Sequence, residues 1–249
     1  MSDFRPPAPF VEPSSRWVRV RAGETEIANS RRTKLLVWYG PGRLPTYCFP
    51  PEDVRTEFIA DNGDVRAGDV LVPGGAQLLT EPAEVAGHWT FAFDTGLTWL
   101  EEATEIHVHA RDTRKRVDAV PSERHVVVEV DGVVVADSHR PTAVFETDLP
   151  VRWYLPPEDV RQDLLVASET VTRCPYKGTA AYWSVRVGDE VRADLAWYYP
   201  DPIPENPRIK GLIAFFNEHV DLTVDGDVQR RPQTPWSTST SGLRSQPQR

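Results

Sequence analysis

Hydrophobic and polar residues alternate with the period of β-strands along much of the chain. Residues 125–138 hold two valine-rich runs on either side of Asp131 and Gly132. An Asp-Gly pair between such runs predicts a tight hairpin, because both central positions of a type I′ turn need positive φ. Residues 16–30 show the same pattern with Gly23 at the tip. The alternation therefore predicts a mainly β protein built from hairpins.

A further hairpin is predicted at residues 181–199. Its alternation places Trp183 and Trp197 on one face, and Tyr182 with Arg186 on the other. We expect the two tryptophans to fill the core, since aromatic rings bury large areas. Tyr182 lies on the polar face of the predicted hairpin and is the better candidate for the wall of a binding site.

The one clear helical signal is the sequence Pro-Pro-Glu-Asp-Val, which occurs at residues 50–54 and again at 156–160. Proline suits the first turn of a helix, where no N–H is needed, and the acidic residues complement the positive end of the helix dipole. We therefore expect a short helix at each occurrence of the motif, packed on the sheet.

The recurrence of this motif indicates an internal duplication. Arg161 follows the second occurrence as Arg55 follows the first, at a separation of 106 residues (161 − 55). Residues 135–140 resemble residues 27–32 at a separation of 108 (140 − 32). The predicted organisation is a proline-rich arm at 1–13, a first small β domain at 14–119, a second one of similar fold at 120–228 and a disordered tail at 229–249.

Composition narrows the functional classes. The 249 residues carry a formal net charge of −9, which disfavours nucleic-acid binding without a local basic patch. No apolar run approaches the roughly 18 residues of a membrane span, and residues 1–10 do not resemble a secretory signal. Two distant cysteines favour neither a disulfide framework nor a zinc site, so we expect a cytoplasmic protein. The acidic stretch 61–69 lacks the pattern of a calcium loop, and we expect no metal and no cofactor.

The duplication supplies an internal control, because a feature that folding needs should appear in both copies. Arg140 has an equivalent in Arg32 and is therefore expected to be structural. The second copy has a group of polar and aromatic residues that the first copy lacks. We expect a ligand to bind to residues of the second copy, namely Glu146, Cys174, Tyr176, Lys177 and Tyr182.

Each candidate has a chemical and a structural interpretation. Cys174 is a nucleophile if a nearby cation lowers its pKa, or a small buried residue of the core. Lys177 holds an anion or forms a Schiff base, or is a solvated lysine before a turn. Glu146 is a partner for Lys177, or an exposed strand residue.

The second copy resembles the bacterial DUF427 proteins, a domain of unknown function. The resemblance rests on the following segments: Val135-Ala-Asp-Ser138, Phe145-Glu146, Trp153-Tyr-Leu-Pro-Pro-Glu-Asp-Val160, Cys174-Pro-Tyr-Lys-Gly178, Tyr182-Trp-Ser-Val185 and Ala196-Trp-Tyr-Tyr-Pro-Asp-Pro202. The first copy departs from this pattern after its Pro-Pro-Glu-Asp-Val motif, so the chain looks like a tandem form with a degenerate first domain. The resemblance implies a small, mainly β domain and no established activity.

Three functions remain open at this point. The leading hypothesis is a module that binds a small anionic or nucleotide-like molecule in its second domain, because aromatic and a few polar residues converge there. The second is an enzyme that uses Cys174 and Lys177 for covalent or acid–base chemistry. The third is a scaffold for protein interactions without a small-molecule site. The sequence leaves the oligomeric state open.

Overall fold

The computed structural model describes residues 9–40 and 42–238 of the chain. The described residues divide into two compact units, a first unit that ends at Thr113 and a second unit that begins at Arg114. Both are built from antiparallel strands, and the helical elements among the described residues are single 3-10 turns of three residues. In the described part of the chain, no helix has the length and apolar character that crossing a membrane needs. The predicted mainly β class is confirmed.

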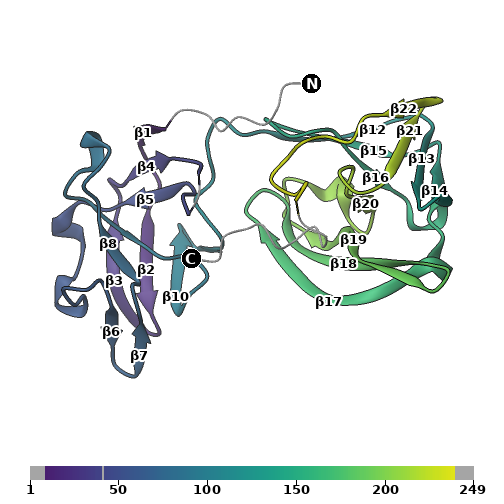
Figure 1. Cartoon of the computed structure of the whole chain (residues 1–249). Helices are drawn as coiled ribbons and strands as arrows, with labels where there is room; N and C mark the ends of the chain where they lie inside the picture. Colours follow the sequence, from purple (N-terminus) through teal and green to yellow (C-terminus); the bar gives the residue numbers. More distant parts are fainter. Residues whose placement is uncertain (1–8, 41, 239–249) are drawn as a thin grey trace. The chain divides into compact units, whose positions relative to one another are not determined.

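The first unit contains two main sheets and two small hairpins (Figure 1). A four-stranded sheet has the order β11-β10-β2-β3, a three-stranded sheet has the order β1-β4-β5, and β6-β7 and β8-β9 are hairpins. The elements are β1 (Phe10–Pro13), β2 (Val18–Ala22), β3 (Thr25–Ser30), β4 (Lys34–Val37), β5 (Thr46–Cys48), η1 (Pro51–Asp53), η2 (Thr56–Phe58), β6 (Val65–Ala67), β7 (Val70–Val72), β8 (Ala76–Leu78), η3 (Ala83–Val85), β9 (Trp89–Phe91), β10 (Leu97–Glu101) and β11 (Thr104–Ile106).

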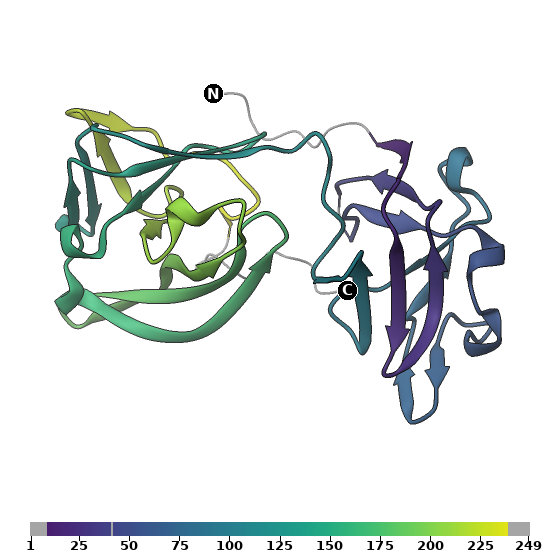
Figure 2. The same ribbon diagram turned by 180° about the vertical axis from the view of Figure 1, so that it is seen from behind.

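The second unit combines a four-stranded sheet, β14-β13-β21-β22, with a seven-stranded sheet, β12-β15-β16-β20-β19-β18-β17. Figures 1 and 2 show the long strands β17, β18 and β19 curving side by side along one side of this unit. The elements are β12 (Val117–Pro121), β13 (Val126–Val130), β14 (Val133–Ser138), β15 (Thr142–Glu146), β16 (Arg152–Leu155), η4 (Pro157–Asp159), η5 (Gln162–Leu164), β17 (Leu165–Cys174), β18 (Gly178–Val187), β19 (Glu190–Pro202), η6 (Pro207–Ile209), β20 (Ile213–Phe215), β21 (Asp221–Val224) and β22 (Asp227–Gln229).

Both faces of the seven-stranded sheet are covered by apolar packing. One face packs against the four-stranded sheet, where valines of β13 meet Leu155, Val185 and Ile213. The other face carries a second cluster, the aromatic face, which consists of Val144, Tyr154, Ala180, Tyr182, Trp197, Tyr199, Ile209, Ala214 and Phe216. The central strands β16 and β20 are buried on both sides, so alternation along them separates two cores rather than core from solvent.

The two units share local structure around the repeated motif. The four-stranded sheets have the same strand order, because β11-β10-β2-β3 of the first unit corresponds to β22-β21-β13-β14 of the second. In addition, β1 pairs with β4 as β12 pairs with β15. An isolated bridge joins Ala28 to Val54 in the first unit and Ala136 to Val160 in the second. Each Pro-Pro-Glu-Asp-Val motif forms a 3-10 turn, and a second 3-10 turn follows it. The expected short helices are thus pairs of 3-10 turns.

The structure differs from the predicted organisation at three places. The units divide at Thr113/Arg114, because β12 pairs with β15 of the second unit. Phe10–Pro13, predicted as part of an arm, form β1 and pair with β4. The predicted disordered tail is wrong for residues 229–238, since Gln229 belongs to β22 and Thr234 Oγ1 donates a hydrogen bond to Glu218 Oε1 at 2.6 Å. The remainder of the predicted tail, 239–249, lies outside the described residues.

The predicted faces of the 181–199 hairpin also need correction. Trp197 is buried as expected, but it lies on the aromatic face, whereas Trp183 packs with the other cluster. The pairing of β18 with β19 shifts between Trp183 and Val185, and Asp194 in this bulge has φ of +52°. Val187 pairs with Glu190 beside the turn and Tyr182 pairs with Trp197, so even-numbered residues of β18 lie opposite odd-numbered residues of β19 on both sides of the bulge. Alternation along each strand by itself does not reveal this pairing.

Candidate functional site

Lys177 lies in the turn between β17 and β18, where its N–H donates to Cys174 O at 3.3 Å. The following residue, Gly178, has φ of +105°, and a Cβ at this position would lie 3.2 Å from the backbone nitrogen of Ile203. Glycine is therefore required by both conformation and space. Asn206 Nδ2 donates to Tyr176 O at 2.8 Å, which ties the turn to the segment after β19.

Lys177, Glu146 and Lys115 form a charged group that we call the lysine–glutamate cluster. The Lys177 ammonium donates a hydrogen bond to Glu146 Oε2, and Lys115 Nζ lies 4.0 Å from Glu146 Oε1. The three side chains are only 12%, 10% and 14% exposed in the order Lys177, Glu146, Lys115. Charges shielded in this way interact more strongly than charges in water.

Aromatic hydroxyls and a thiol surround the cluster. Burial raises the pKa of Tyr154 to about 12, and burial also raises the pKa of Tyr199 well above its ordinary value. Burial by itself lowers the pKa of Lys177, but the attraction of Cys174, Glu146 and Tyr154 outweighs burial, and the net pKa is raised. Lys177 therefore carries a full positive charge at neutral pH. Cys174 packs against the aromatic face and is half-buried.

Tyr182 does not occupy the exposed polar face that the alternation predicted. It is 7% exposed, belongs to the aromatic face, and its hydroxyl lies 2.7 Å from Thr172 Oγ1. Tyr182 and Lys177 are therefore both shielded from solvent. Both side chains are mostly buried and bonded, so their loss affects packing as well as any site.

The structure brings the predicted site residues together in one region of the second unit. Glu146 is the partner of Lys177, as the sequence suggested, and Cys174 lies close enough to both Lys177 and Tyr182 to influence their pKa values. Tyr176 is buried beside them in the same turn. The interpretation of Lys177 as a solvated lysine is therefore wrong.

Sequence reasoning missed three residues around this group, namely Lys115, Tyr154 and Tyr199. Lys115 precedes β12, the edge strand that pairs with β15 and so approaches Glu146. Tyr154 and Tyr199 alternate with residues of the opposite cluster on β16 and β19. Alternation in the sequence indicates that Tyr154 and Tyr199 lie on the opposite face from their neighbours. It does not indicate that this opposite face is also buried.

A separate polar clasp joins Ser138, Arg140 and Asp159. Ser138 Oγ donates to Asp159 Oδ2 at 2.8 Å, and Arg140 donates to both oxygens of Asp159 at 3.1 and 3.0 Å. Hydrogen bonds from Arg140, then from Ser138, hold the pKa of Asp159 below its usual value.

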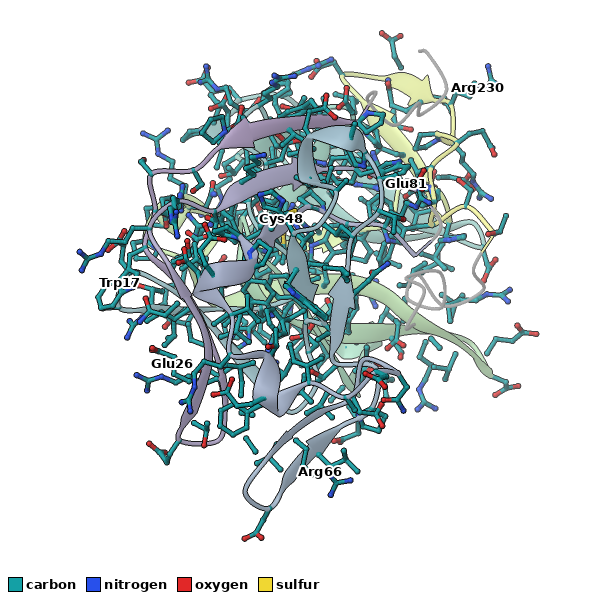
Figure 3. The ribbon with its side chains drawn as sticks, turned by 90° about the vertical axis from the view of Figure 1, so that its left-hand side faces the viewer. Trp17, Glu26, Cys48, Arg66, Glu81 and Arg230 are labelled. Atoms are coloured by element: carbon teal, nitrogen blue, oxygen red, sulfur yellow. The ribbon has the colours of Figure 1, made fainter. Side chains whose placement is uncertain are left out.

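The first unit repeats the same clasp with Ser30, Arg32 and Asp53. Ser30 Oγ lies 2.6 Å from Asp53 Oδ2, and Arg32 donates to both Asp53 oxygens at 3.1 and 2.9 Å. A feature present in both units meets the criterion for a structural role, as predicted for Arg140. A shallow surface hollow of about 390 Å³ lies over this first clasp, and its lining includes Trp17 and Arg31. Figure 3 labels Trp17 at the margin of the first unit.

Comparison with known proteins places the second unit. The profile of a family described as a domain of unknown function (DUF427) matches residues 118–226. The matched segment contains Glu146, Cys174, Tyr176, Lys177 and Tyr182, whereas Lys115 lies just before it. A search of the curated proteins found no match. The match thus covers most of the second unit, and residues 118–226 have the sequence features of a DUF427 domain.

Proposed function

We propose that the second unit binds a small molecule through an anionic group at the lysine–glutamate cluster. The observation that carries this proposal is the Lys177 ammonium, which is 12% exposed and is held in place by Glu146. A shielded cation that an oriented carboxylate positions is suited to recognise phosphate or carboxylate as a point charge.

The hydrogen-bonding capacity at the cluster supports this proposal. An ammonium has three donors, and among the described residues Glu146 is the one acceptor for Lys177, which leaves two N–H groups for a ligand. The Tyr199 hydroxyl has no hydrogen-bond partner within residues 9–40 and 42–238. The half-buried thiol of Cys174 lies in the same region. Aromatic walls with a few polar groups are typical of small-molecule sites.

We further propose that the first unit is a second copy of the same domain that lacks this site. The shared clasp, the shared strand order and the shared bridges support this relationship. Trp38 occupies the position of Glu146, and the guanidinium of Arg43 lies 3.4 Å from the centre of its ring. The first copy thus has an aromatic stacking pair where the second has a carboxylate and an ammonium.

The free thiols of Cys48 and Cys174 support a cytoplasmic location.

Titration calorimetry of the full chain with inorganic phosphate, adenosine monophosphate and succinate tests the proposed function. We expect at least one of the three to bind with one ligand per chain, and Lys177→Ala to weaken its binding by tenfold or more. Lys210→Ala is the matched control, since Lys210 pairs with Asp201 at 3.0 Å on the surface. Binding that survives Lys177→Ala, or a chain that binds none of the three, would count against the proposal.

Denaturant melts of the same variants separate ligand binding from a purely structural role. If the wild-type chain binds no anion and Lys177→Ala loses several kcal/mol of unfolding free energy, the cluster acts as a structural clasp and the scaffold hypothesis replaces ours. The alternative of an enzyme that uses Cys174 predicts stoichiometric loss of an activity when this thiol is alkylated, while anion binding persists.

A further inference from the structure

We infer that the β13–β14 hairpin of the second unit carries a binding site for a divalent transition-metal ion of the zinc type, formed by His125, Asp137 and His139. This site is separate from the lysine–glutamate cluster, and the inference does not depend on the proposed function. Each residue offers one ligand atom, and these three atoms all lie within 4.8 Å of one another.

The register of the hairpin explains why these three side chains converge. Val126 pairs with Ser138 and Val127 pairs with Asp137, so the register places His125 opposite His139. Asp137 precedes His139 by two residues and therefore lies on the same face of the strand. Val126 and Ser138 are buried, and the residues on either side of them therefore point away from the core. His125 is half-buried, and Asp137 and His139 are exposed.

The three side chains also interact with one another. His125 Nε2 lies 2.7 Å from Asp137 Oδ1, and the rings of His125 and His139 stack with their centres 4.0 Å apart and their planes 13° apart. Four-coordinate zinc with bonds of about 2.0–2.1 Å places its ligand atoms about 3.3 Å from one another. His125 Nε2 and Asp137 Oδ1 must therefore move slightly apart, and any wider donor pair, at no more than 4.8 Å, must close by at most about 1.5 Å. Rotation of two exposed side chains on a paired backbone allows both changes.

The donor chemistry selects the class of ion. Two imidazole nitrogens and one carboxylate oxygen suit zinc and its first-row neighbours, whereas calcium and magnesium prefer sets of oxygen ligands. Three protein ligands leave a coordination position for water. Asp225 accepts hydrogen bonds from the backbone N–H of His125 at 2.9 Å and from the Arg124 side chain, which fixes the backbone that carries the first ligand.

The corresponding hairpin of the first unit provides an internal comparison. At a separation of 108 residues, Trp17, Asn29 and Arg31 occupy the positions of His125, Asp137 and His139. Trp17 Nε1 donates to Asn29 Oδ1 at 2.8 Å, and the guanidinium of Arg31 lies 5.0 Å from the Trp17 ring. The same backbone arrangement thus brings three side chains together in both units, but only the second unit supplies metal-ligand atoms at all three positions.

Titration of the full, untagged chain with Zn²⁺, followed by calorimetry, tests this inference. We expect one equivalent to bind, and His139→Ala and Asp137→Asn each to weaken binding by tenfold or more. His107→Ala is the matched control. His107 also lies near carboxylates, at 3.7 Å from an oxygen of Glu105 and 4.0 Å from one of Asp94, but it belongs to no candidate metal-binding group among the described residues. The His107→Ala variant should bind Zn²⁺ with the affinity of the wild-type chain.

Substitution of Co²⁺ for Zn²⁺ identifies the ligands independently. A site of two imidazoles and a carboxylate gives visible d–d absorption without a thiolate charge-transfer band, and His139→Ala should abolish this absorption. A thiolate band, loss of binding in Cys174→Ser, or one equivalent that persists in both hairpin variants would place the ion elsewhere and overturn the inference. Absence of any bound Zn²⁺ in the wild-type chain would overturn it as well.

Discussion

At the scale of single residues, burial sets the chemistry that each side chain can perform. The chain has two cysteines, and both are free thiols in the structure. Cys48 is fully buried, and burial raises its pKa to about 12. Cys174 is half-buried and lies beside the charged turn that carries Lys177. The two thiols therefore form a matched pair within one molecule, one shielded and one accessible.

We expect iodoacetamide at pH 8 to alkylate Cys174 well before Cys48 in the folded chain. Only the thiolate reacts, and Cys48 is protonated and inaccessible at this pH. Peptide mass spectrometry over a time course measures the two labelled fractions. Equal rates in the folded chain would contradict the expectation, and equal rates in denaturant are the control.

The Ser-Arg-Asp clasp predicts an acid-dependent contribution to stability. The pKa of Asp159 is lowered in the folded state by hydrogen bonds from Arg140 and Ser138. A lowered carboxyl pKa stabilises the fold above the unfolded pKa of about 3.9, and this contribution is lost as the pH falls through the folded value.

Asp159→Asn should therefore lower the urea midpoint of unfolding at pH 7, and the difference should be smaller at pH 3. Urea melts of the wild-type and variant chains at both pH values measure the difference. A midpoint difference that is the same at both pH values would show that the clasp acts through shape rather than charge. Asp53→Asn tests the equivalent contact of the first unit.

At the scale of elements, a buried ion pair joins β16 to the segment after β20. Arg152 donates two hydrogen bonds to Glu218, at 2.7 and 2.6 Å, and the two side chains are 9% and 0% exposed, respectively. Burial raises the pKa of Glu218, but the contacts with Arg152 outweigh burial and the net pKa is lowered. The carboxylate therefore stays ionised at neutral pH.

We expect Arg152→Met to lower the unfolding free energy by about 3–5 kcal/mol, because it leaves a buried charge without its partner. Adding Glu218→Gln should recover part of this loss, since the second change removes the uncompensated charge. Guanidinium melts of the single and double variants make the comparison. A double variant that is less stable than Arg152→Met would contradict this account.

The segment after β22 covers this ion pair. The ring of Trp236 lies 5.8 Å from the guanidinium of Arg152, and its carbonyl oxygen lies 2.9 Å from His219 Nε2. We expect Trp236→Ala to lower the unfolding free energy by roughly 1–3 kcal/mol, because it exposes a half-buried aromatic ring and the charges beneath it. Chemical denaturation measures the effect, and Val228→Ala, at a residue that is 79% exposed, is the control that should change little.

At the scale of the whole molecule, each unit has its own hydrophobic cores. The first unit packs around Trp99 and Phe49, and the second packs on both faces of its seven-stranded sheet. Trp99 is 1% exposed and stacks on Phe93 at 4.4 Å. The two units therefore depend on separate sets of buried side chains.

Trp99→Ala should lower the stability of the first unit by about 3–5 kcal/mol, the usual effect of removing a core aromatic ring. Scanning calorimetry should resolve an early transition for the first unit, while Zn²⁺ binding at the second unit is unchanged below that transition. Loss of Zn²⁺ binding in the folded Trp99→Ala chain would contradict separate cores.

Local sequence was sufficient for the features that depend on neighbouring residues. Alternation and Asp-Gly turns identify the hairpins, and the recurrence of Pro-Pro-Glu-Asp-Val marks the two clasps, whose Arg and Asp lie about twenty residues apart in each unit. The pairing of Glu146 with Lys177 was also accessible, because their residue types complement each other.

Tertiary structure decided whatever depends on strand register and on what covers a face. The register of β18 and β19 placed Trp197 opposite Tyr182, and the second buried face made Tyr182 a core residue rather than the wall of a pocket. Cross-strand pairing places His125 opposite His139, although the sequence around either histidine contains no metal-binding motif. These outcomes follow from long-range pairing, in which a shift of one residue exchanges the faces of a strand, and such pairing has no signature within a short window of sequence.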